Sequence, residues 1–296
     1  HGTAADQPRR IKYKKLASCA LHGPGRRADG SSARDRVREA GAIDEEQTPQ
    51  ETDAELAVRL ATQAGRGLVA LRERLMAEGA HTWQVMDGGD TASQRFIADE
   101  LRRLRPDDPI LSEEGLEDPR RFTLDRVWII DPLDGTREYG EPGRTDWAVH
   151  VALWDHGRFA AAAVALPALG VTFAADPPPV LPEVHRERPI LVTSRSRAPY
   201  AAAIVARALD AQAVRLGSAG AKAMSVVTGE TDIYVHDGGM YQWDSAAPAA
   251  VALAAGLHVS RLDGSPIVYN GRDPWLPDLI VCRKEWAEPV LQALWG

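Results

Sequence analysis

The sequence predicts an α/β fold in two parts, each of which combines a β-sheet with helices. In residues 190–294, short apolar runs rich in β-branched residues alternate with helical patterns, which is typical of a sheet covered by helices. In residues 148–173, strand-like runs are separated only by turn residues, which indicates a meander. Between these parts, residues 176–189 are dense in proline and poor in apolar residues. We therefore expect one domain over residues 52–188 and a second over 189–296.

The first part is expected to begin with a long amphipathic helix. Apolar residues recur at near-helical spacing from Leu56 to Leu75, which predicts a helix over residues 53–78. Thr52 or Asp53 would cap it, since both residue types favour that position. After it we expect an extended piece over 83–90, a helix over 91–104 that Pro106 ends, and strands over 110–111, 127–130, 148–154, 161–166 and 171–173.

The second part is expected to form a mixed sheet covered by helices. Strands are expected over residues 190–192, 213–216, 232–235 and 279–282 and around Val259. Helices are expected over residues 199–209, 222–228, 244–255 and 285–294. A chain of 296 residues with 44% hydrophobic content is long enough to fill the cores of one large or two medium domains.

The N-terminal segment differs in composition from the rest. Residues 1–43 hold ten Lys or Arg and four Asp or Glu, a balance of about +6, without a sustained apolar period. Since the whole chain carries −7, the remainder carries about −13. A basic segment could bind nucleic acid, but aromatic residues for stacking on bases are nearly absent here. We expect residues 1–51 to be a disordered leader.

Composition also indicates where in the cell the protein is expected. No window approaches 18 uninterrupted apolar residues, and no stretch has the charged start, apolar middle and small-residue cleavage site of a signal peptide. Cys19 lies in a polar segment and Cys282 ends an apolar run, so neither is expected in a disulfide or a metal site. We expect a cytoplasmic protein with no membrane partner and no nucleic-acid partner.

Asp131 and Asp134 follow an apolar run that predicts a buried strand. Pro132 fixes its own φ and offers no N–H, so we expect it to end the strand. The two carboxylates would then converge on one point. Oxygen ligands of this kind suit Mg²⁺, which takes oxygen atoms at roughly 2.0–2.1 Å in an octahedron.

Two more acidic segments fit the same centre. Glu113 and Glu114 end a second short strand, and Asp244 opens an alanine-rich stretch. Taken alone, the glutamates would be a solvated turn, Asp244 a helix N-cap, and the pair Asp131 and Asp134 an Asx turn. Because each segment lies at the exit of a strand-like run, the three together favour a shared metal site.

The order of these motifs carries a resemblance to a known family. Leu-Ser-Glu-Glu at 111–114, Trp-Ile-Ile-Asp-Pro-Leu-Asp-Gly-Thr at 128–136 and Trp-Asp-Ser-Ala-Ala at 243–247 resemble the inositol monophosphatase superfamily of Mg²⁺-dependent, lithium-sensitive phosphatases. The resemblance extends from about residue 53 to residue 295. Asp-Gly-Thr-Arg-Glu-Tyr at 134–139 is similar to the signature of the 3'(2'),5'-bisphosphate nucleotidase branch, and residues 193–196 and 217–222 also resemble that branch.

This resemblance implies a fold and a metal centre. The fold would be an inositol-monophosphatase-like, layered α-β-α-β-α sandwich with the active site between two subdomains. Two or three Mg²⁺ ions would bind, and Asp131 would bridge two of them. The metal ligands would be Glu113, Asp131, the carbonyl of Leu133, Asp134 and Asp244.

The resemblance also implies catalytic roles and a reaction. Asp90 would pair with Thr136, whose hydroxyl would activate a water; the alternative for Asp90 is a plain helix N-cap. The reaction would be hydrolysis of the 3'-phosphate of adenosine 3',5'-bisphosphate to give AMP, in sulfur assimilation and nucleotide recycling. Two alternatives stay open: an inositol monophosphatase or fructose-1,6-bisphosphatase activity, and a catalytically silent nucleotide-binding module.

The expected partner is a small phosphorylated nucleotide. A homodimer is the oligomeric state that we consider for the chain. Residues 135–137 lie where a helix would begin, so their N–H groups can hold a phosphate. Lys222 is a candidate for the second phosphate, with a solvated lysine as the alternative. Tyr139, Tyr241 and Trp243 could flank an adenine, although aromatic residues near strand ends are more often core. The expected substrate-binding residues are Glu113, Gly135, Thr136, Arg137, Arg195, Ser218, Lys222 and Asp244.

Overall fold

The computed structural model describes residues 51–196 and 199–296. The leader expected over residues 1–51 therefore lies, apart from Glu51, outside the described residues. Residues Thr52–Gly296 form one compact unit. None of the helices in this described part is long and apolar enough to span a membrane.

The first sheet is a five-stranded meander with one added parallel strand. Its order is β1-β2-β3-β4-β5, in which β1 pairs with β2 in parallel and the other neighbours are antiparallel. The strands are β1 Ile110–Ser112, β2 Arg126–Asp134, β3 Ala148–Asp155, β4 Arg158–Leu166 and β5 Val171–Ala174. The meander predicted for residues 148–173 is confirmed.

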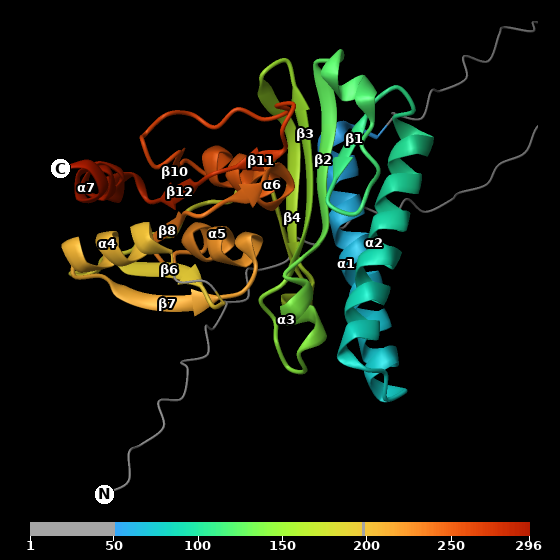
Figure 1. The fold of residues 1–296 in the computed structure, drawn as a ribbon, viewed down its shortest axis with the longest axis horizontal. Coiled ribbons are helices and arrows are strands. Elements are labelled where there is room, and N and C mark those ends of the chain that lie inside the picture. The colour runs from blue at the N-terminus through green and yellow to red at the C-terminus, as the bar shows by residue number, and fades with distance from the viewer. Residues whose placement is uncertain (1–50, 197–198) are drawn as a thin grey trace, which may run out of the picture. The chain divides into compact units, whose positions relative to one another are not determined.

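Two long helices cover one face of this sheet, α1 (Asp53–Ala77) on β3 and β4 and α2 (Thr82–Leu104) beside it on β2 (Figure 1). Thr52 caps α1: its hydroxyl accepts from the Glu55 N–H, and the Glu55 carboxylate accepts from the Thr52 N–H. The buried side of α1 packs with β2, β3 and β4 into one apolar core. The predicted long first helix and its cap are confirmed.

The extended piece expected over residues 83–90 is wrong, because α2 is continuous from Thr82 to Leu104. Gly88 and Gly89 weaken its intrinsic helix propensity, yet packing outweighs that cost. A Cβ on Gly89 would lie 2.5 Å from the Tyr139 ring and 2.9 Å from the Leu133 side chain. Glycine at position 89 therefore lets α2 approach the segment that follows β2.

The expected end of β2 at Pro132 is also wrong, because the strand continues to Asp134. Asp131 pairs with His150 and Asp134 with Ala148, and the register shifts between these pairs. Proline is tolerated at such an irregularity, where no ladder hydrogen bond is required from its nitrogen. The shift changes the directions in which the Asp131 and Asp134 side chains point, as bulges beside functional sites often do.

The second sheet is mixed, as the sequence predicts, in the order β10-β12-β8-β6-β7. Strand β6 is parallel to β7 and β8, whereas β12 is antiparallel to β8 and β10. Its strands are β6 Ile190–Ser194, β7 Gln212–Leu216, β8 Ile233–His236, β10 His258–Ser260 and β12 Leu279–Cys282. A small pair of strands, β9 (Met240–Tyr241) with β11 (Trp275–Leu276), was not expected from the sequence.

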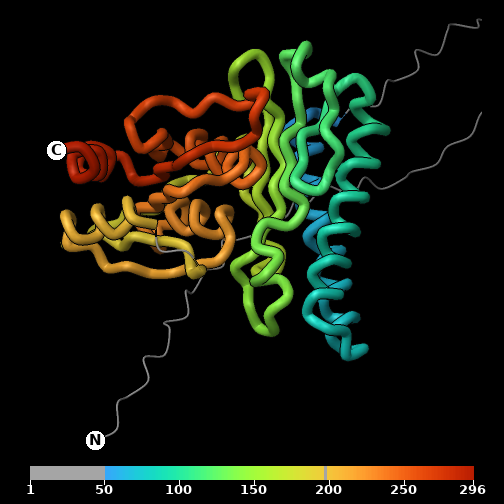
Figure 2. The backbone as a smooth tube through the Cα atoms, viewed as in Figure 1, coloured from blue at the N-terminus to red at the C-terminus, as the bar shows by residue number. Residues whose placement is uncertain are grey.

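The elements stack in five layers (Figure 1). Helices α5 (Ala219–Val227) and α6 (Gln242–Ala254) lie between the two sheets, and α6 packs on β2, β3 and β4. Helices α4 (Tyr200–Ala208) and α7 (Lys284–Trp295) pack together on the far side of the second sheet. Figure 2 shows the yellow-to-red second half on one side of the green sheet and the blue α1 on the other. The predicted layered α-β-α-β-α arrangement is confirmed.

The two sheets lie on either side of residues 176–189 in the sequence, a segment without helix or strand. The division into domains at residue 188 stays a prediction, because residues 52–296 cluster as one unit.

Candidate active site

Three carboxylates from distant parts of the chain meet at the C-terminal end of β2. Oxygen atoms of Asp131, Asp134 and Asp244 all lie within 4.8 Å of one another. The first two are on β2, and Asp244 is in the first turn of α6. Asp131 is fully buried and Asp134 nearly so. The convergence predicted from the sequence is therefore present for these three residues.

Backbone N–H groups hold the three side chains in place. Asp131 accepts from the Leu133 N–H through Oδ1 (3.1 Å). Asp134 accepts from the first turn of α5, from the Ala219 N–H (3.1 Å) and the Gly220 N–H (2.6 Å). Asp244 accepts from the Tyr241 N–H (2.6 Å) at the start of α6. Each carboxylate is thus restrained by at least one main-chain N–H group.

The crowding of these acids shifts their titration. Burial, followed by repulsion from Asp134 and Glu113, raises the pKa of Asp131 well above its usual value. Burial and repulsion from Asp134 raise the pKa of Asp244 to about 6. Burial opposes ionisation of Asp134 too, but His150, Lys222 and the Gly220 amide outweigh it and lower that pKa. The site therefore concentrates negative charge that the protein alone does not neutralise.

A divalent cation fits this group of residues. Oδ2 of Asp131 is buried and accepts no hydrogen bond from the described residues, an arrangement that is costly unless another positive partner binds. Hard cations prefer carboxylate and carbonyl oxygens, which is the donor set here. The three acidic residues can therefore hold a metal ion.

Glu113 lies in the loop after β1, near this cluster but outside the group whose atoms meet. As a residue it is exposed, yet burial of its carboxyl end, then repulsion from Asp244 and Glu114, raises its pKa to about 8. Repulsion from Asp244 and Asp134 contributes to this shift, and Glu113 in turn raises the pKa of Asp131. Its role as a metal ligand stays a prediction.

The expected pair of Asp90 and Thr136 is formed. The Thr136 hydroxyl lies 3.1 Å from Asp90 Oδ1 and 3.1 Å from the Leu133 carbonyl oxygen, and it can donate its one hydrogen to either. Asp90 is in the middle of α2, so the N-cap alternative is wrong. Burial raises the pKa of Asp90 to about 7, against the hydrogen bond from Thr136, which lowers it. The pair is close enough for proton exchange.

The turn after Asp134 comes close to the start of α5. Gly135 has φ of 87°, and a Cβ there would lie 2.9 Å from the Ser218 side chain. Thr136 begins the short helix α3 (Thr136–Gly140), and the Arg137 side chain is exposed. Ser218 caps α5, its hydroxyl accepting from the Ala221 N–H. Contacts of these residues with a phosphate stay predictions.

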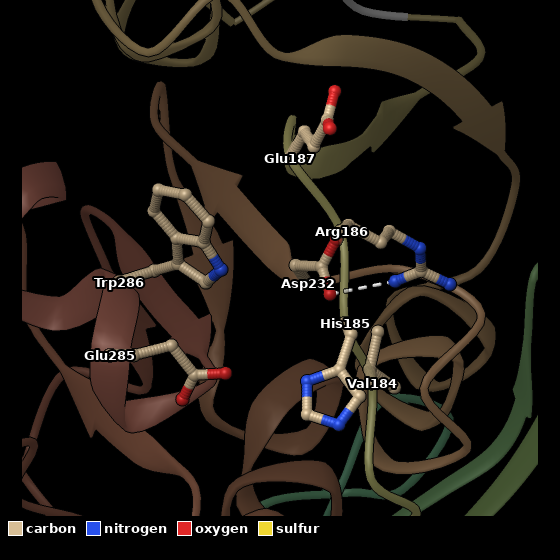
Figure 3. Close-up of a pocket in the computed structure, with 7 residues that line it drawn as sticks. All are labelled: Val184, His185, Arg186, Glu187, Asp232, Glu285 and Trp286. Carbon is tan, nitrogen blue, oxygen red and sulfur yellow. Dashed lines mark hydrogen bonds and ion pairs between the residues drawn. The ribbon is translucent and has the colours of Figure 1, made fainter.

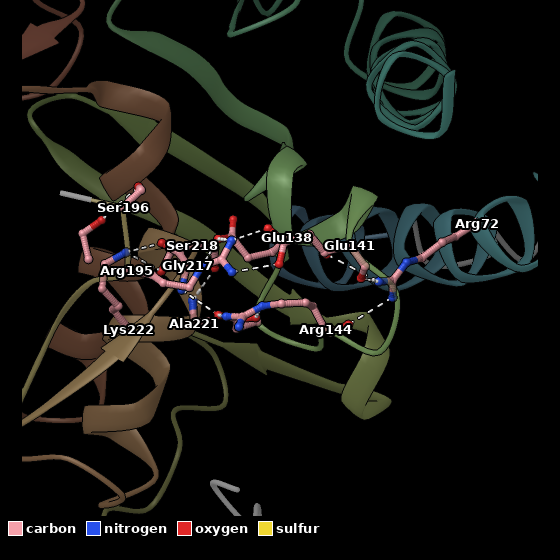
Figure 4. Close-up of polar contacts among 12 residues, drawn as sticks. Arg72, Glu138, Glu141, Arg144, Arg195, Ser196, Gly217, Ser218, Ala221 and Lys222 are labelled. Atoms are coloured by element: carbon pink, nitrogen blue, oxygen red, sulfur yellow. Dashed lines mark hydrogen bonds and ion pairs between the residues drawn. The ribbon is translucent and has the colours of Figure 1, made fainter. Parts of the chain in front are cut away.

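The two cations proposed for the second phosphate differ in access (Figure 4). Lys222 is 3% exposed and donates to the carbonyls of Gly217 (2.5 Å) and Ser218 (2.8 Å). The alternative of a solvated lysine is therefore wrong, and the buried amine stabilises the loop before α5. Arg195 is partly exposed and pairs with Glu138 and Glu141, which raises its pKa. Arg195 is the cation that a ligand can reach.

The three aromatic candidates also differ. Tyr139 is fully buried, donates its hydroxyl to the Leu68 carbonyl and packs edge-on against Trp147, so it belongs to the core. Tyr241 and Trp243 stack with ring centroids 4.7 Å apart and an interplanar angle of 13°. Tyr241 is 45% exposed and Trp243 is 9% exposed. The exposed ring lies at the start of the helix that carries Asp244.

Sequence reasoning missed His150 and Asp146. His150 is fully buried opposite Asp131 in the β2–β3 pairing. Asp146 pairs with Arg144 and accepts from the Gly217 N–H (2.6 Å). A lone histidine inside the apolar run of residues 148–154 was the available signal for His150.

A separate cavity of about 600 Å³ lies between residues 184–187 and α7 (Figure 3). Its wall contains the ion pair of Arg186 with Asp232 (2.7 Å), and Arg186 also donates to the Gly229 carbonyl. Glu285 and Trp286 line the opposite side. None of the metal-binding carboxylates lines this cavity, and its polar groups anchor residues 184–187 to the second sheet.

Five alternating layers and a buried carboxylate cluster at a strand end define an α/β protein with a candidate metal site. The model of the inositol monophosphatase family matches residues 50–296. The chain belongs to this family, and it is an enzyme of the phosphatase class.

Named relatives agree with that assignment. The chain is 47% identical over 257 residues to the 3'-phosphoadenosine 5'-phosphate phosphatase of Mycobacterium leprae, a match that covers 81% of this chain and 92% of the relative. It is 46% identical to the protein of the same name from Mycobacterium tuberculosis, covering 78% and 89%. It is 34% identical to the 3'(2'),5'-bisphosphate nucleotidase CysQ of Escherichia coli, covering 63% and 80%.

Solved structures support the fold. CysQ from Bacteroides thetaiotaomicron superposes with a TM-score of 0.67 at 24% identity, covering 79% of this chain and 98% of that one. Inositol monophosphatase II from Staphylococcus aureus gives 0.67 at 22% identity, covering 81% and 97%. At this identity the likeness shows the fold alone.

Proposed function

We propose that this protein is a Mg²⁺-dependent phosphatase that removes the 3'-phosphate of adenosine 3',5'-bisphosphate and releases AMP, as a step of sulfur assimilation and nucleotide recycling. The observation that carries the proposal is the convergence of Asp131, Asp134 and Asp244 within 4.8 Å beside the Asp90–Thr136 pair. The names of the relatives at 46–47% identity support the choice of substrate.

The carboxylates of Asp131, Asp134 and Asp244 would hold Mg²⁺, with Glu113 and the Leu133 carbonyl as further ligands. When bound, such ions supply positive charge that stabilises the oxygens of a transferring phosphoryl group. The Gly135 turn, with Thr136 and Arg137, would position the phosphate. This assignment is supported by their proximity to β2, because a phosphate bound there would lie beside the acidic centre.

Thr136 and Asp90 would move the proton of the attacking water. Thr136 would accept a proton from the water as it passes its own hydrogen to Asp90 Oδ1, which lies 3.1 Å away. A group whose pKa is near the operating pH suits this role, and burial raises the pKa of Asp90 to about 7.

Recognition of the nucleotide would use aromatic residues at the start of α6 and a cation that follows β6. The exposed ring of Tyr241, backed by Trp243, offers a flat face for an adenine. Arg195 would bind the 5'-phosphate, since it is more exposed than Lys222 and a guanidinium suits phosphate geometry. Lys222 would act through the loop of Gly217 and Ser218 that it holds.

Phosphate release from a substrate panel tests the proposal. With Mg²⁺, adenosine 3',5'-bisphosphate should give the highest kcat/KM, above its 5'-phosphosulfate relative, inositol 1-phosphate and fructose 1,6-bisphosphate. A preference for either of the last two would replace the nucleotide assignment with a sugar or inositol phosphatase. Tight nucleotide binding without phosphate release would indicate a silent binding module. Lithium should inhibit in the tens of millimolar range, on the order of what displaces a weakly held Mg²⁺.

A further inference from the structure

His150 contacts both elements that carry the carboxylate cluster, β2 and α6, and also α5, which donates to Asp134. It is on β3, directly across from Asp131 in the strand pairing, and its side chain is fully buried. No part of the reaction proposed above uses it. A buried imidazole with polar neighbours on both sides therefore calls for a separate explanation.

One ring nitrogen fixes the orientation of the imidazole. Nδ1 lies 3.1 Å from the carbonyl oxygen of Trp243. A carbonyl only accepts, so Nδ1 must carry the hydrogen and donate it. Trp243 immediately precedes Asp244 at the start of α6, so this bond ties β3 to the helix that supplies the third carboxylate.

The opposite nitrogen, Nε2, lies beside a carboxylate from β2 without a hydrogen bond to it among the described residues. Nε2 lies 3.2 Å from Asp134 Oδ2, the same oxygen that accepts from the Gly220 N–H. A Cβ on Gly220 would lie 2.2 Å from Nε2 and 3.2 Å from Asp134 Oδ2. Glycine at the start of α5 is therefore required for the imidazole and the amide to approach one oxygen together.

We infer that His150 is a positioning residue that sets the separation of Asp134 and Asp244, and thereby the affinity of the metal centre. The ring spans from the β2 carboxylate to the α6 main chain, and α5 closes against it at Gly220. The inference rests on the proposed metal site but not on the identity of the substrate. Residues that orient metal ligands typically change metal affinity about 10- to 100-fold when replaced.

Two substitutions each disrupt one side of this arrangement. The side-chain amide of His150→Asn can still donate near the position of Nδ1 to the Trp243 carbonyl, but it does not reach Asp134. The longer His150→Gln places its amide near Nε2 and Asp134. The matched control is His156→Asn, because His156 is an exposed residue with φ of 48°, which asparagine tolerates.

The experiment measures Mg²⁺ and Mn²⁺ binding by calorimetry without substrate, together with the melting temperature of the metal-free proteins. Both His150 variants should lose about 10- to 100-fold in metal affinity, and His156→Asn should retain it. At saturating metal, kcat should recover while KM for the nucleotide changes little. Wild-type metal affinity in both His150 variants would overturn the inference.

A measurement on the wild-type protein covers the case in which the variants do not fold. In histidine-labelled protein, the ring signals of His150 should shift when Mg²⁺ is added, and those of His156 should not. Unchanged His150 signals at saturating Mg²⁺ would contradict the inference. If the His150 variants lose metal affinity while the wild type hydrolyses none of the nucleotides, the proposed substrate fails and the positioning role stands.

Discussion

Asp131 has an oxygen, Oδ2, that is buried and accepts no hydrogen bond from the described residues, whereas both oxygens of Asp134 accept main-chain N–H groups. This difference gives neighbouring aspartates different tasks. Both oxygens of Asp134 already accept hydrogen bonds from α5, so Asp134 mainly contributes a negative charge in a fixed position. Asp131 keeps an oxygen that no described residue satisfies and that a bound cation would satisfy, so it should carry the larger share of metal binding.

Replacing Asp131 should therefore cost more than replacing a nearby exposed acid. We expect Asp131→Asn to lower kcat/KM by about 100-fold or more, because it removes a buried carboxylate that would hold the metal. Glu114→Gln is the control, since Glu114 is exposed and influences the site only through repulsion. Steady-state kinetics over a range of Mg²⁺ concentrations measures both. Similar losses in the two variants would refute the ligand assignment.

Arg195 should discriminate between bisphosphates and monophosphates. A charge-assisted contact is worth roughly 1.5–3 kcal/mol, so Arg195→Ala should lower kcat/KM for adenosine 3',5'-bisphosphate by about 10- to 100-fold. Hydrolysis of inositol 1-phosphate should change far less. Arg195→Lys keeps the charge and should recover part of the loss. Equal effects on both substrates would show that the Arg195 pairs with Glu138 and Glu141 only hold the fold.

Lys222 should behave differently, because its amine is buried against two carbonyls. Lys222→Met leaves the carbonyls of Gly217 and Ser218 without their donor, at a cost of about 1–3 kcal/mol in the free energy of unfolding. Activity on both substrates should fall in proportion. Urea unfolding with parallel kinetics tests this, and a loss confined to the bisphosphate would return the second-phosphate role to Lys222.

Local sequence pattern predicts most of the helices and strands, whereas tertiary packing decides some of their boundaries. Helix α1, the meander and the alternation of the second half follow from apolar periodicity, so the sequence predicts them. The breaks expected within α2 and at Pro132 rested on local propensity, and contacts with Tyr139 and Leu133 override it at Gly89. The three converging aspartates could be predicted because their strand and helix ends are visible in sequence. The role of His150 could not, since only the strand pairing reveals what lies opposite it.

Two glycines in neighbouring helices give a direct comparison of propensity with packing. Gly67 in α1 is exposed, and a Cβ added there would meet no atom within 4 Å, so Gly67→Ala should stabilise the protein by about 0.5–1 kcal/mol. Gly89→Ala should instead destabilise it by about 1–3 kcal/mol, because the new methyl overlaps the Tyr139 ring. Thermal unfolding measures both signs. Stabilisation by both variants would mean that Tyr139 moves aside readily.

For the whole molecule, the metal centre links parts of the chain that are distant in sequence. Asp131 and Asp134 come from the first sheet, whereas Asp244 comes from a helix that packs on that sheet and also contacts β10 and β12 of the second. Repulsion between Asp244 and the two aspartates of β2 therefore acts between residues from the two halves of the sequence. Stability and metal binding should therefore be coupled over the entire unit.

This coupling predicts a pH dependence with a definite sign. The pKa values of Glu113, Asp90 and Asp244 are raised to about 8, 7 and 6, mainly by burial. The folded metal-free protein therefore binds more protons than the unfolded chain between about pH 4 and pH 8, so its stability falls as pH rises through that range. The melting temperature should drop about 2–4 °C for each kcal/mol lost.

Calorimetric melting at pH 5.5, 6.5 and 8 with EDTA or with Mg²⁺ checks the sign. Mg²⁺ should raise the melting temperature most at pH 8, where the carboxylates are free to bind it. In the metal-free protein, Asp131→Asn should flatten the decline, since one crowded carboxylate is gone. A metal-free protein that becomes more stable from pH 5.5 to 8 would contradict the electrostatic account.

The packing of α6 determines how two fragments of the polypeptide would behave if the backbone were cut between the two sheets. Most of this helix is buried, and it packs on the first sheet although it belongs to the second half of the sequence. Val180, which is 93% exposed in the intervening segment, offers a place to cut the backbone without removing buried contacts. Two separately produced fragments would each expose an apolar face that only the other covers. They should reassemble on mixing into a split enzyme, with neither fragment holding a complete set of metal ligands alone.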